Sequence, residues 1–151
     1  MAYDINDRGD IVGQSAFDDS SFHAVRWSAG NVLDLGKLTG GRSSEATAIN
    51  NLGVIVGDSG TADGDQHAVL WKEGAITDLN SFLSEANRAH LILKSANDIN
   101  DQGWIVGTAV QDGRNVAYLL APVPEPGTWA LLSAGILILV ARERGLRRQL
   151  A

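Results

Sequence analysis

The stretch that decides the fold occurs three times in the chain. Residues 49–57 read INNLGVIVG, residues 5–13 read INDRGDIVG and residues 99–107 read INDQGWIVG. In each copy an Asn-Asx-x-Gly element is followed by a short apolar run. Because Asn and Asp side chains bond to the backbone of turns and Gly adopts positive φ, each element predicts a β-hairpin. Intervals of 44 and 50 residues between the copies predict a repeat array such as a propeller or a solenoid.

A second motif follows the first two copies at a fixed distance. It consists of His-Ala-Val-x-Trp and, after a turn, a short run that ends in Asp-Leu. The third copy lacks the histidine and the tryptophan. We therefore expect four short strands per unit, about the size of one propeller blade. The matching segments are HAVRW at 23–27, HAVLW at 67–71 and VAYLL at 116–120.

The combined pattern resembles the extracellular HAF-repeat family over residues 4–121. This resemblance implies an extracellular or surface location and no particular activity. Three units are fewer than the roughly four to eight blades of a closed propeller, so we expect an open array with exposed edge strands. An insertion at 79–87 precedes the third unit and predicts a short helix capped by Asn80 or Ser81.

The last 29 residues have the layout of a membrane-sorting tail. The two prolines at 124 and 126 remove backbone donors and predict an extended linker. The uncharged run from Gly127 to Ala141 spans roughly 22 Å as a helix, somewhat less than a bilayer core of about 30 Å. Trp129 lies where an interfacial anchor is expected, and arginine stems lengthen the span at its inner end. The arginines are Arg142, Arg144, Arg147 and Arg148.

This tail closely resembles the PEP-CTERM sorting signal in residues 123–132, the apolar run and the terminal arginines. The resemblance implies export, recognition by an exosortase membrane protease, and release or transfer to the surface of a Gram-negative bacterium that makes exopolysaccharide or biofilm. The four arginines serve as a membrane stop, and membrane lipid is a further expected partner. The expected recognition residues are Val123, Pro124, Glu125 and Pro126.

The expected fold class is all-β: an array of four-stranded, propeller-like units that form an incomplete propeller, then a proline linker and one short C-terminal transmembrane helix. The expected domains are a repeat region at 1–121, a linker at 122–127, a transmembrane helix at 128–141 and a basic cytoplasmic tail at 142–151. The expected units are about 4–44, 45–94 and 95–121.

Charge and composition exclude several classes of function. Two acidic and four basic side chains follow residue 123, so residues 1–123 hold 16 of the 18 acidic and 8 of the 12 basic side chains. This acidic region argues against a nucleic-acid partner, because phosphate binding needs basic surfaces. The chain has no cysteine, which excludes disulfides, thiolate metal sites and thiol nucleophiles. Residues 1–20 contain no signal peptide, and we therefore expect a longer protein.

Several chemical motifs have simpler structural interpretations. Gly57-Asp58-Ser59-Gly60 resembles the surroundings of a serine nucleophile, and residues 36–43 have nearly the spacing of a P-loop, but both fit turns and strands of the repeat better. His23 and His67 are each expected to hydrogen-bond a turn of their own unit rather than to bind a metal. Trp27 and Trp71 are expected to fill the space between sheets.

Acidic turns at 18–19 and 63–65 are the calcium candidates, although neither has a full ligand series and solvated acidic turns are commoner. No metal site, cofactor or catalytic residue is expected otherwise. We therefore expect an exported, non-enzymatic surface protein that binds or scaffolds extracellular polysaccharide of the biofilm matrix. One alternative is a fragment of an extracellular glycan-binding or glycan-active propeller whose active residues lie in missing N-terminal repeats. Another is a glycan-binding module that uses Trp27, Trp71 or Trp104 for stacking.

Overall fold

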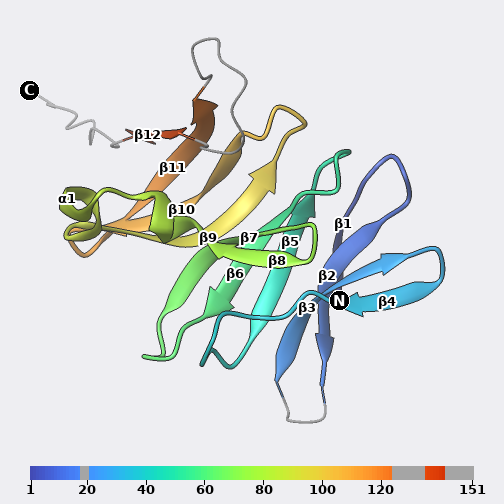
Figure 1. Cartoon of the computed structure of the whole chain (residues 1–151). Helices are drawn as coiled ribbons and strands as arrows, with labels where there is room; N and C mark the ends of the chain where they lie inside the picture. Colours follow the sequence, from blue (N-terminus) through green and yellow to red (C-terminus); the bar gives the residue numbers. More distant parts are fainter. Residues whose placement is uncertain (18–20, 124–134, 142–151) are drawn as a thin grey trace, which may run out of the picture.

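The computed structural model describes residues 1–17, 21–123 and 135–141, and the statements below concern these residues. They form three antiparallel sheets of four strands each, which follow one another in chain order (Figure 1). The first sheet comprises β1 (Ala2–Ile5), β2 (Ile11–Ala16), β3 (Phe22–Ser28) and β4 (Asn31–Asp34). The second comprises β5 (Ser44–Ile49), β6 (Ile55–Gly60), β7 (Gln66–Lys72) and β8 (Ala75–Asp78). The third comprises β9 (Leu91–Ile99), β10 (Ile105–Gln111), β11 (Arg114–Val123) and β12 (Gly135–Ala141).

Each repeated Asn-Asx-x-Gly element forms the turn of the first hairpin of its sheet. In the middle unit the Asn50 side chain accepts hydrogen bonds from the backbone N–H groups of Leu52 (3.1 Å) and Val54 (2.9 Å). Gly53 has φ +80°, and its counterparts Gly9 and Gly103 have φ +79°. A side chain is strained in this left-handed region. The predicted hairpins are therefore confirmed, together with the reason for the glycine.

The last glycine of the motif lies inside a strand, where it leaves room for the neighbouring backbone. A Cβ on Gly57 would lie 1.9 Å from the carbonyl oxygen of Glu45 on the adjacent strand. The pairing of β5 with β6 shifts register at this point, between Ala46 and Ala48. A bulge of this kind increases the local twist of a sheet. The glycine is thus required by close contact between two strands rather than by a turn.

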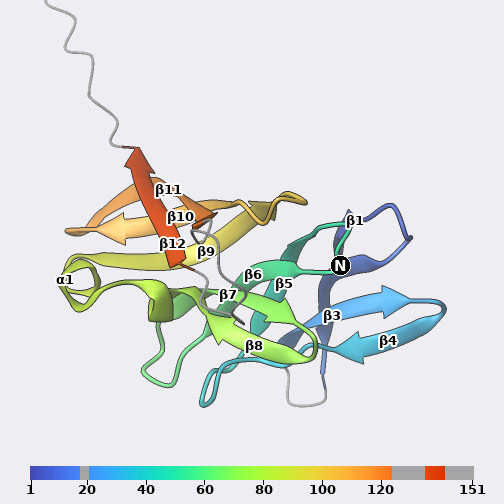
Figure 2. The same ribbon diagram turned by 45° about the horizontal axis from the view of Figure 1, so that its top comes forward.

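The three sheets pack face to face in a row. Strand β5 packs across β1, β2 and β3 of the first sheet, and β9 packs across β5, β6 and β7 of the second sheet (Figure 2). Apolar side chains fill each junction, and the middle sheet is therefore covered on both faces. The first core contains Val12, Ala24, Ala46, Ile49, Ile55, Val69 and Trp71. The second contains Val56, Ala68, Leu79, Leu93, Ala96, Ile99, Ile105 and Leu120, among others.

The insertion before the third sheet contains two short helices rather than one. A 3-10 helix spans Leu79–Phe82 with Asp78 as its N-cap, and α1 spans Glu85–Arg88 with Ser84 as its N-cap. The predicted caps were therefore wrong. Asn80 is instead a buried side chain that bonds to both the backbone N–H (2.8 Å) and the carbonyl oxygen (2.9 Å) of Leu93. The insertion is thus fixed to the third sheet.

The C-terminal segment also differs from its prediction as a helix over 128–141. Residues 135–141 form β12, which pairs antiparallel with β11, and residues 128–134 lie outside the described part of the chain. The segment has the sequence GILILVA, with β-branched residues at alternate positions, and the edge of β11 offers backbone groups for pairing. In the part of the chain that the structure describes, no helix is long and apolar enough to cross a membrane.

Candidate functional site

The three Asn-Asx-x-Gly turns lie next to one another and are joined through their first asparagines. The Asn6 side-chain amide donates to the carbonyl oxygen of Asn50 (3.2 Å), and the Asn50 amide donates to the carbonyl oxygen of Asn100 (3.1 Å). Asn6 and Asn50 are both buried, so their polar groups need such partners. Each of these two asparagines therefore stabilises its own hairpin and also bonds it to the next unit.

The hydrogen bonds between consecutive turns form a ladder, which we call the asparagine ladder. Asn51, the second residue of the middle turn, adds further bonds to it. The side chain of Asn51 accepts from the backbone N–H of Asp7 (2.9 Å) and donates to the carboxylates of Asp7 (2.8 Å) and Asp101 (3.1 Å). The Asn51 backbone N–H donates to Asp101 in turn (2.8 Å). A neutral amide thus separates two exposed carboxylates and bonds to both. At this position the sequence has Asn in the middle copy and Asp in both outer copies. The pattern indicates bonding between the turns, and sequence reasoning missed it.

The repeated histidines are paired within their own sheets. His23 Nδ1 lies 2.9 Å from a carboxylate oxygen of Asp34, and His67 Nδ1 lies 2.7 Å from one of Asp78. These aspartates belong to the Asp-Leu element of the second motif. The motif therefore encodes a His–Asp pair on adjacent strands, on β3 and β4 in the first sheet and on β7 and β8 in the second. The expectation that each histidine bonds within its unit is confirmed. The partner is the end of a strand rather than a turn.

The first histidine, His23, has two further neighbours. Lys37 Nζ lies 2.7 Å from His23 Nε2. Because an ammonium group donates, Nε2 accepts at this contact and the Nδ1 proton points to Asp34. Phe17 stacks on the ring, with 4.3 Å between the ring centroids. Both ring nitrogens are thus occupied by protein groups.

No group of three His, Cys, Asp or Glu side chains is arranged to hold a metal ion within residues 1–17, 21–123 and 135–141. Of the two calcium candidates, residues 18–19 lie outside these ranges. At the other, the hydroxyl of Thr61 bonds to Asp63, and Lys94 of the third sheet forms an ion pair with Asp65. The hydrogen bond from Lys94 is the main reason that the pKa of Asp65 lies below its ordinary value.

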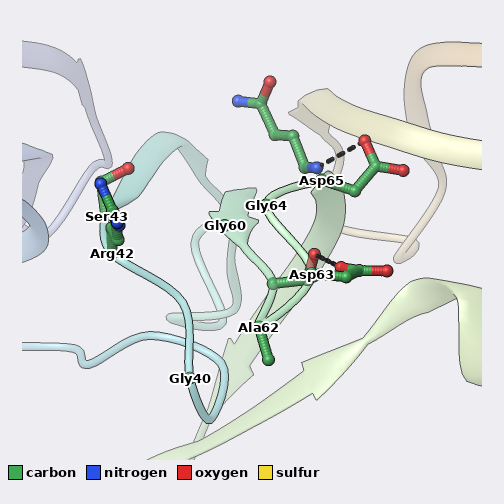
Figure 3. Close-up of a pocket in the computed structure, with 10 residues that line it drawn as sticks. Gly40, Arg42, Ser43, Gly60, Ala62, Asp63, Gly64 and Asp65 are labelled. Atoms are coloured by element: carbon green, nitrogen blue, oxygen red, sulfur yellow. Dashed lines mark hydrogen bonds between the residues drawn. The ribbon is translucent and has the colours of Figure 1, made fainter.

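A polar cleft of about 610 Å³ lies beside this acidic turn (Figure 3). One wall is the loop that leads into β5, with Arg42 and Ser43, and the other is the turn between β6 and β7. Gly40 approaches Ala62 so closely that a Cβ on the glycine would lie 2.6 Å from the Ala62 side chain. The cleft is thus lined largely by polar and charged residues, although the Gln66 amide bonds to Asp58 and the Asp65 carboxylate to Lys94. Its lining residues are Gly40, Arg42, Ser43, Gly60, Thr61, Ala62, Asp63, Gly64, Asp65 and Gln66.

Behind the same hairpin, Asp58 on β6 faces two polar neighbours. Gln66 donates to its carboxylate, and Glu45 is its cross-strand partner on β5. Burial raises the pKa of Asp58 from 3.8 to about 6; the hydrogen bond from Gln66 opposes this shift and the charge of Glu45 adds to it. In the first sheet the equivalent residue is Gln14, which bonds to Glu45 (3.0 Å). Asp58 is thus a half-buried acid at a place where the neighbouring repeat has a neutral amide.

The remaining sequence candidates are structural. Ser59 is fully buried, and its hydroxyl oxygen accepts from the backbone N–H of Leu38 (2.9 Å), which fits a structural serine rather than a nucleophile. The glycine-rich loop leads into strand β5 rather than into a helix, so it is not a P-loop. Trp71 fills the space between sheets as expected, whereas Trp27 is partly exposed and Trp104 is 48% exposed.

A second, more apolar groove of about 500 Å³ lies between the second and third sheets at the end that carries the turns. Leu52, Val54 and Phe82 contribute to its walls, and Ala121 and Pro122 form its edge near the end of β11. The groove therefore reaches the start of the C-terminal tail.

The tail residues expected to act in sorting lie mostly beyond the described ranges. Val123 is the last residue of β11, whereas Pro124, Glu125, Pro126 and Trp129 fall outside the description. The same holds for the arginines Arg142, Arg144, Arg147 and Arg148. Their roles remain predictions from sequence, as does the likeness of residues 4–121 to the HAF-repeat family.

Comparison with known proteins identifies the tail. Residues 122–148 match the model of the PEP-CTERM protein-sorting motif. No curated protein and no solved structure matches the chain. The matched segment contains the Pro-Glu-Pro element, the apolar run and all four arginines of the tail. The chain therefore carries a PEP-CTERM sorting signal, which implies an exported protein that an exosortase processes at a membrane-associated C-terminal segment.

Proposed function

We propose that this protein is a non-enzymatic surface or extracellular protein of a Gram-negative bacterium, whose β-repeat region binds or scaffolds polysaccharide of the biofilm matrix. The sorting motif at 122–148 is the observation that carries the proposal. In this proposal Pro124, Glu125 and Pro126 are substrate residues, which an exosortase recognises and cuts nearby. The repeat region is the part delivered to the surface.

The tail acts in the membrane before cleavage. In a bilayer the backbone groups of residues 128–141 have no water partner, so a helix is the conformation that satisfies them within one segment. Trp129 then anchors the segment at one interface, and the four arginines keep its end in the cytoplasm. Strand β12 is the alternative pairing for part of the same segment when β11 is within reach.

The polar cleft beside Arg42 is the proposed contact for polysaccharide. Its hydroxyl, amide, guanidinium and carboxylate groups suit a ligand rich in hydroxyl groups. The alternative of glycan stacking on tryptophan loses support from Trp71, which is buried, and keeps it at Trp104. We place no catalytic step in the repeat region. A propeller-like arrangement of the units is part of the same proposal.

Blocking cleavage tests the sorting role. The double variant Pro124→Ala/Pro126→Ala, expressed in the native cells, is expected to stay uncleaved in the membrane fraction, because the extended element that the protease recognises is lost. Pro122→Ala is the matched control, since it makes the same change outside the Pro-Glu-Pro element, and it should be processed normally. Normal processing of the double variant would contradict the assignment.

Binding tests the second half of the proposal independently. Arg42→Ala is expected to weaken binding of the chain to polysaccharide purified from the same cells about tenfold, measured by calorimetry. Lys72→Ala removes an exposed cation outside the cleft and should leave binding unchanged. Equal binding by both variants would show that the polysaccharide binds outside this cleft.

A further inference from the structure

The two junctions between sheets are built from equivalent residues. In each junction two residues of one unit, which we call its forward face, pack on two residues of the next unit, which we call its backward face. In the first junction the forward face is Val12 and Ala24, and the backward face is Ala46 and Ile49. In the second junction the forward face is Val56 and Ala68, and the backward face is Ala96 and Ile99. The chain thus uses one type of contact twice.

The outer units leave one face of each type open. Ile5, at the backward face of the first unit, is 61% exposed, whereas its counterparts Ile49 and Ile99 are 5% and 6% exposed. Val106, at the forward face of the third unit, is 44% exposed, whereas Val12 and Val56 are fully buried. Ala2 and Ala117, the other members of these two faces, are exposed as well. The open faces therefore match the two halves of a junction.

The ladder of turns ends in the same complementary way. Within the chain each asparagine amide donates toward the following unit. The Asn100 amide nitrogen has no hydrogen-bond partner among the residues that the structure describes, while the Asn100 side-chain oxygen accepts from Trp104 N (2.9 Å). At the opposite end, the carbonyl oxygen of Asn6 accepts within its own turn, from Gly9 (2.9 Å), and from no other turn among the residues that the structure describes. One end thus offers a donor and the other an acceptor.

We propose that these open faces bind a second copy of the chain, head to tail, with the forward face of one third unit packed on the backward face of another first unit. A second copy is the occupant because it carries both halves of a contact that the fold already makes twice. The contact is heterologous, so it closes into a ring if the rotation per unit permits and otherwise extends into a filament.

Cysteine crosslinking tests the proposal, because the chain has no cysteine of its own. Full-length Ile5→Cys and Val106→Cys chains are mixed in mild detergent and treated with a short bismaleimide. A crosslinked dimer is expected in the mixture at a yield at least fivefold above that of either variant alone, since each contact joins one residue of each kind. Equal yields in the single-variant samples, or no dimer in the mixture, would overturn the proposal.

Sedimentation of the full chain without crosslinker provides a second readout. Wild type is expected to associate, into a dimer if the ring closes and into larger species if it does not. Ile5→Lys should raise the dissociation constant at least tenfold. Leu52→Lys is the matched control, because Leu52 is an exposed apolar residue of the middle unit outside both faces, and it should leave association unchanged. A monomeric wild type, or equal effects of the two variants, would contradict a head-to-tail contact.

Discussion

Val56 and Val106 hold the same place in the repeat, yet the first is enclosed and the second faces solvent. The middle sheet packs on a sheet at each of its two faces, whereas the third sheet, among the described residues, packs on another sheet only through β9. Local sequence is nearly the same at both places, with Gly-x-Ile-Val-Gly in each copy. The hairpin is therefore encoded locally, while burial is conferred by the adjacent unit. Substitutions at equivalent positions separate these two contributions.

The largest expected difference concerns the isoleucine that precedes the turn. Ile49→Ala is expected to lower the free energy of unfolding by about 3 kcal/mol, because it leaves a cavity between the first and second sheets. Ile5→Ala makes the same change at a face that is open in the monomer, and at protein concentrations too low for association we expect it to cost less than about 0.5 kcal/mol. Urea unfolding of the full-length variants measures both values. Equal losses would show that the two isoleucines have similar surroundings.

The asparagine ladder predicts a smaller difference. Asn50→Ala removes the bond to Asn100 and leaves the N–H groups of Leu52 and Val54 without their acceptor, at a cost of roughly 2 kcal/mol. Asn100→Ala removes the bond within its own turn to Trp104 but none to a following unit, and it should cost about half as much. Thermal unfolding of the two variants under the same conditions tests this. A larger effect at Asn100 would contradict a ladder that runs between the units.

The smallest difference is a dependence on pH at Asp58. Its folded pKa of about 6 lies above the ordinary 3.8, so the folded state binds the proton more tightly than the unfolded state does. This contribution to stability is therefore present below about pH 4 and is lost as pH rises through about 6. Asp58→Gln supplies the neutral residue type of Gln14. The substitution should abolish this loss of folding free energy with rising pH. We expect the loss to be about 1 kcal/mol, because the half-buried carboxylate is screened by solvent.

The control for this prediction is the difference between wild type and variant across the pH range, since other carboxylates titrate in both proteins. Unfolding is followed from pH 4 to pH 8. We expect the variant to gain stability relative to wild type as pH rises. A constant difference would show that Asp58 titrates normally in the folded chain.

Sequence predicted the features that depend on neighbours along the chain. The turns at Asn6, Asn50 and Asn100, the four strands of each of the first two units and the bonding of His67 within its own sheet follow from local pattern. The aspartate that binds each histidine was missed, although it recurs eleven residues later in both full copies. That fixed spacing on two adjacent strands was the available signal.

Features that depend on distant contacts were not predictable in the same way. Lys94 reaches Asp65 from another sheet, and neither residue belongs to a repeated motif. Residues 135–141 suit either a helix in lipid or a strand beside β11, because their apolar, β-branched sequence permits both and the surroundings decide. The tail was identified from sequence because a sorting signal is read as a linear pattern rather than as a fold.

The most direct test of the proposed sorting is to determine the C-terminal residue of the mature protein, purified from its own cells, by mass spectrometry. An exosortase substrate should end near Pro126 and lack the segment that contains the apolar run and Arg142 to Arg148. A mature protein that still ends at Ala151 would contradict processing at the Pro-Glu-Pro element, and the tail would then serve as a permanent membrane anchor.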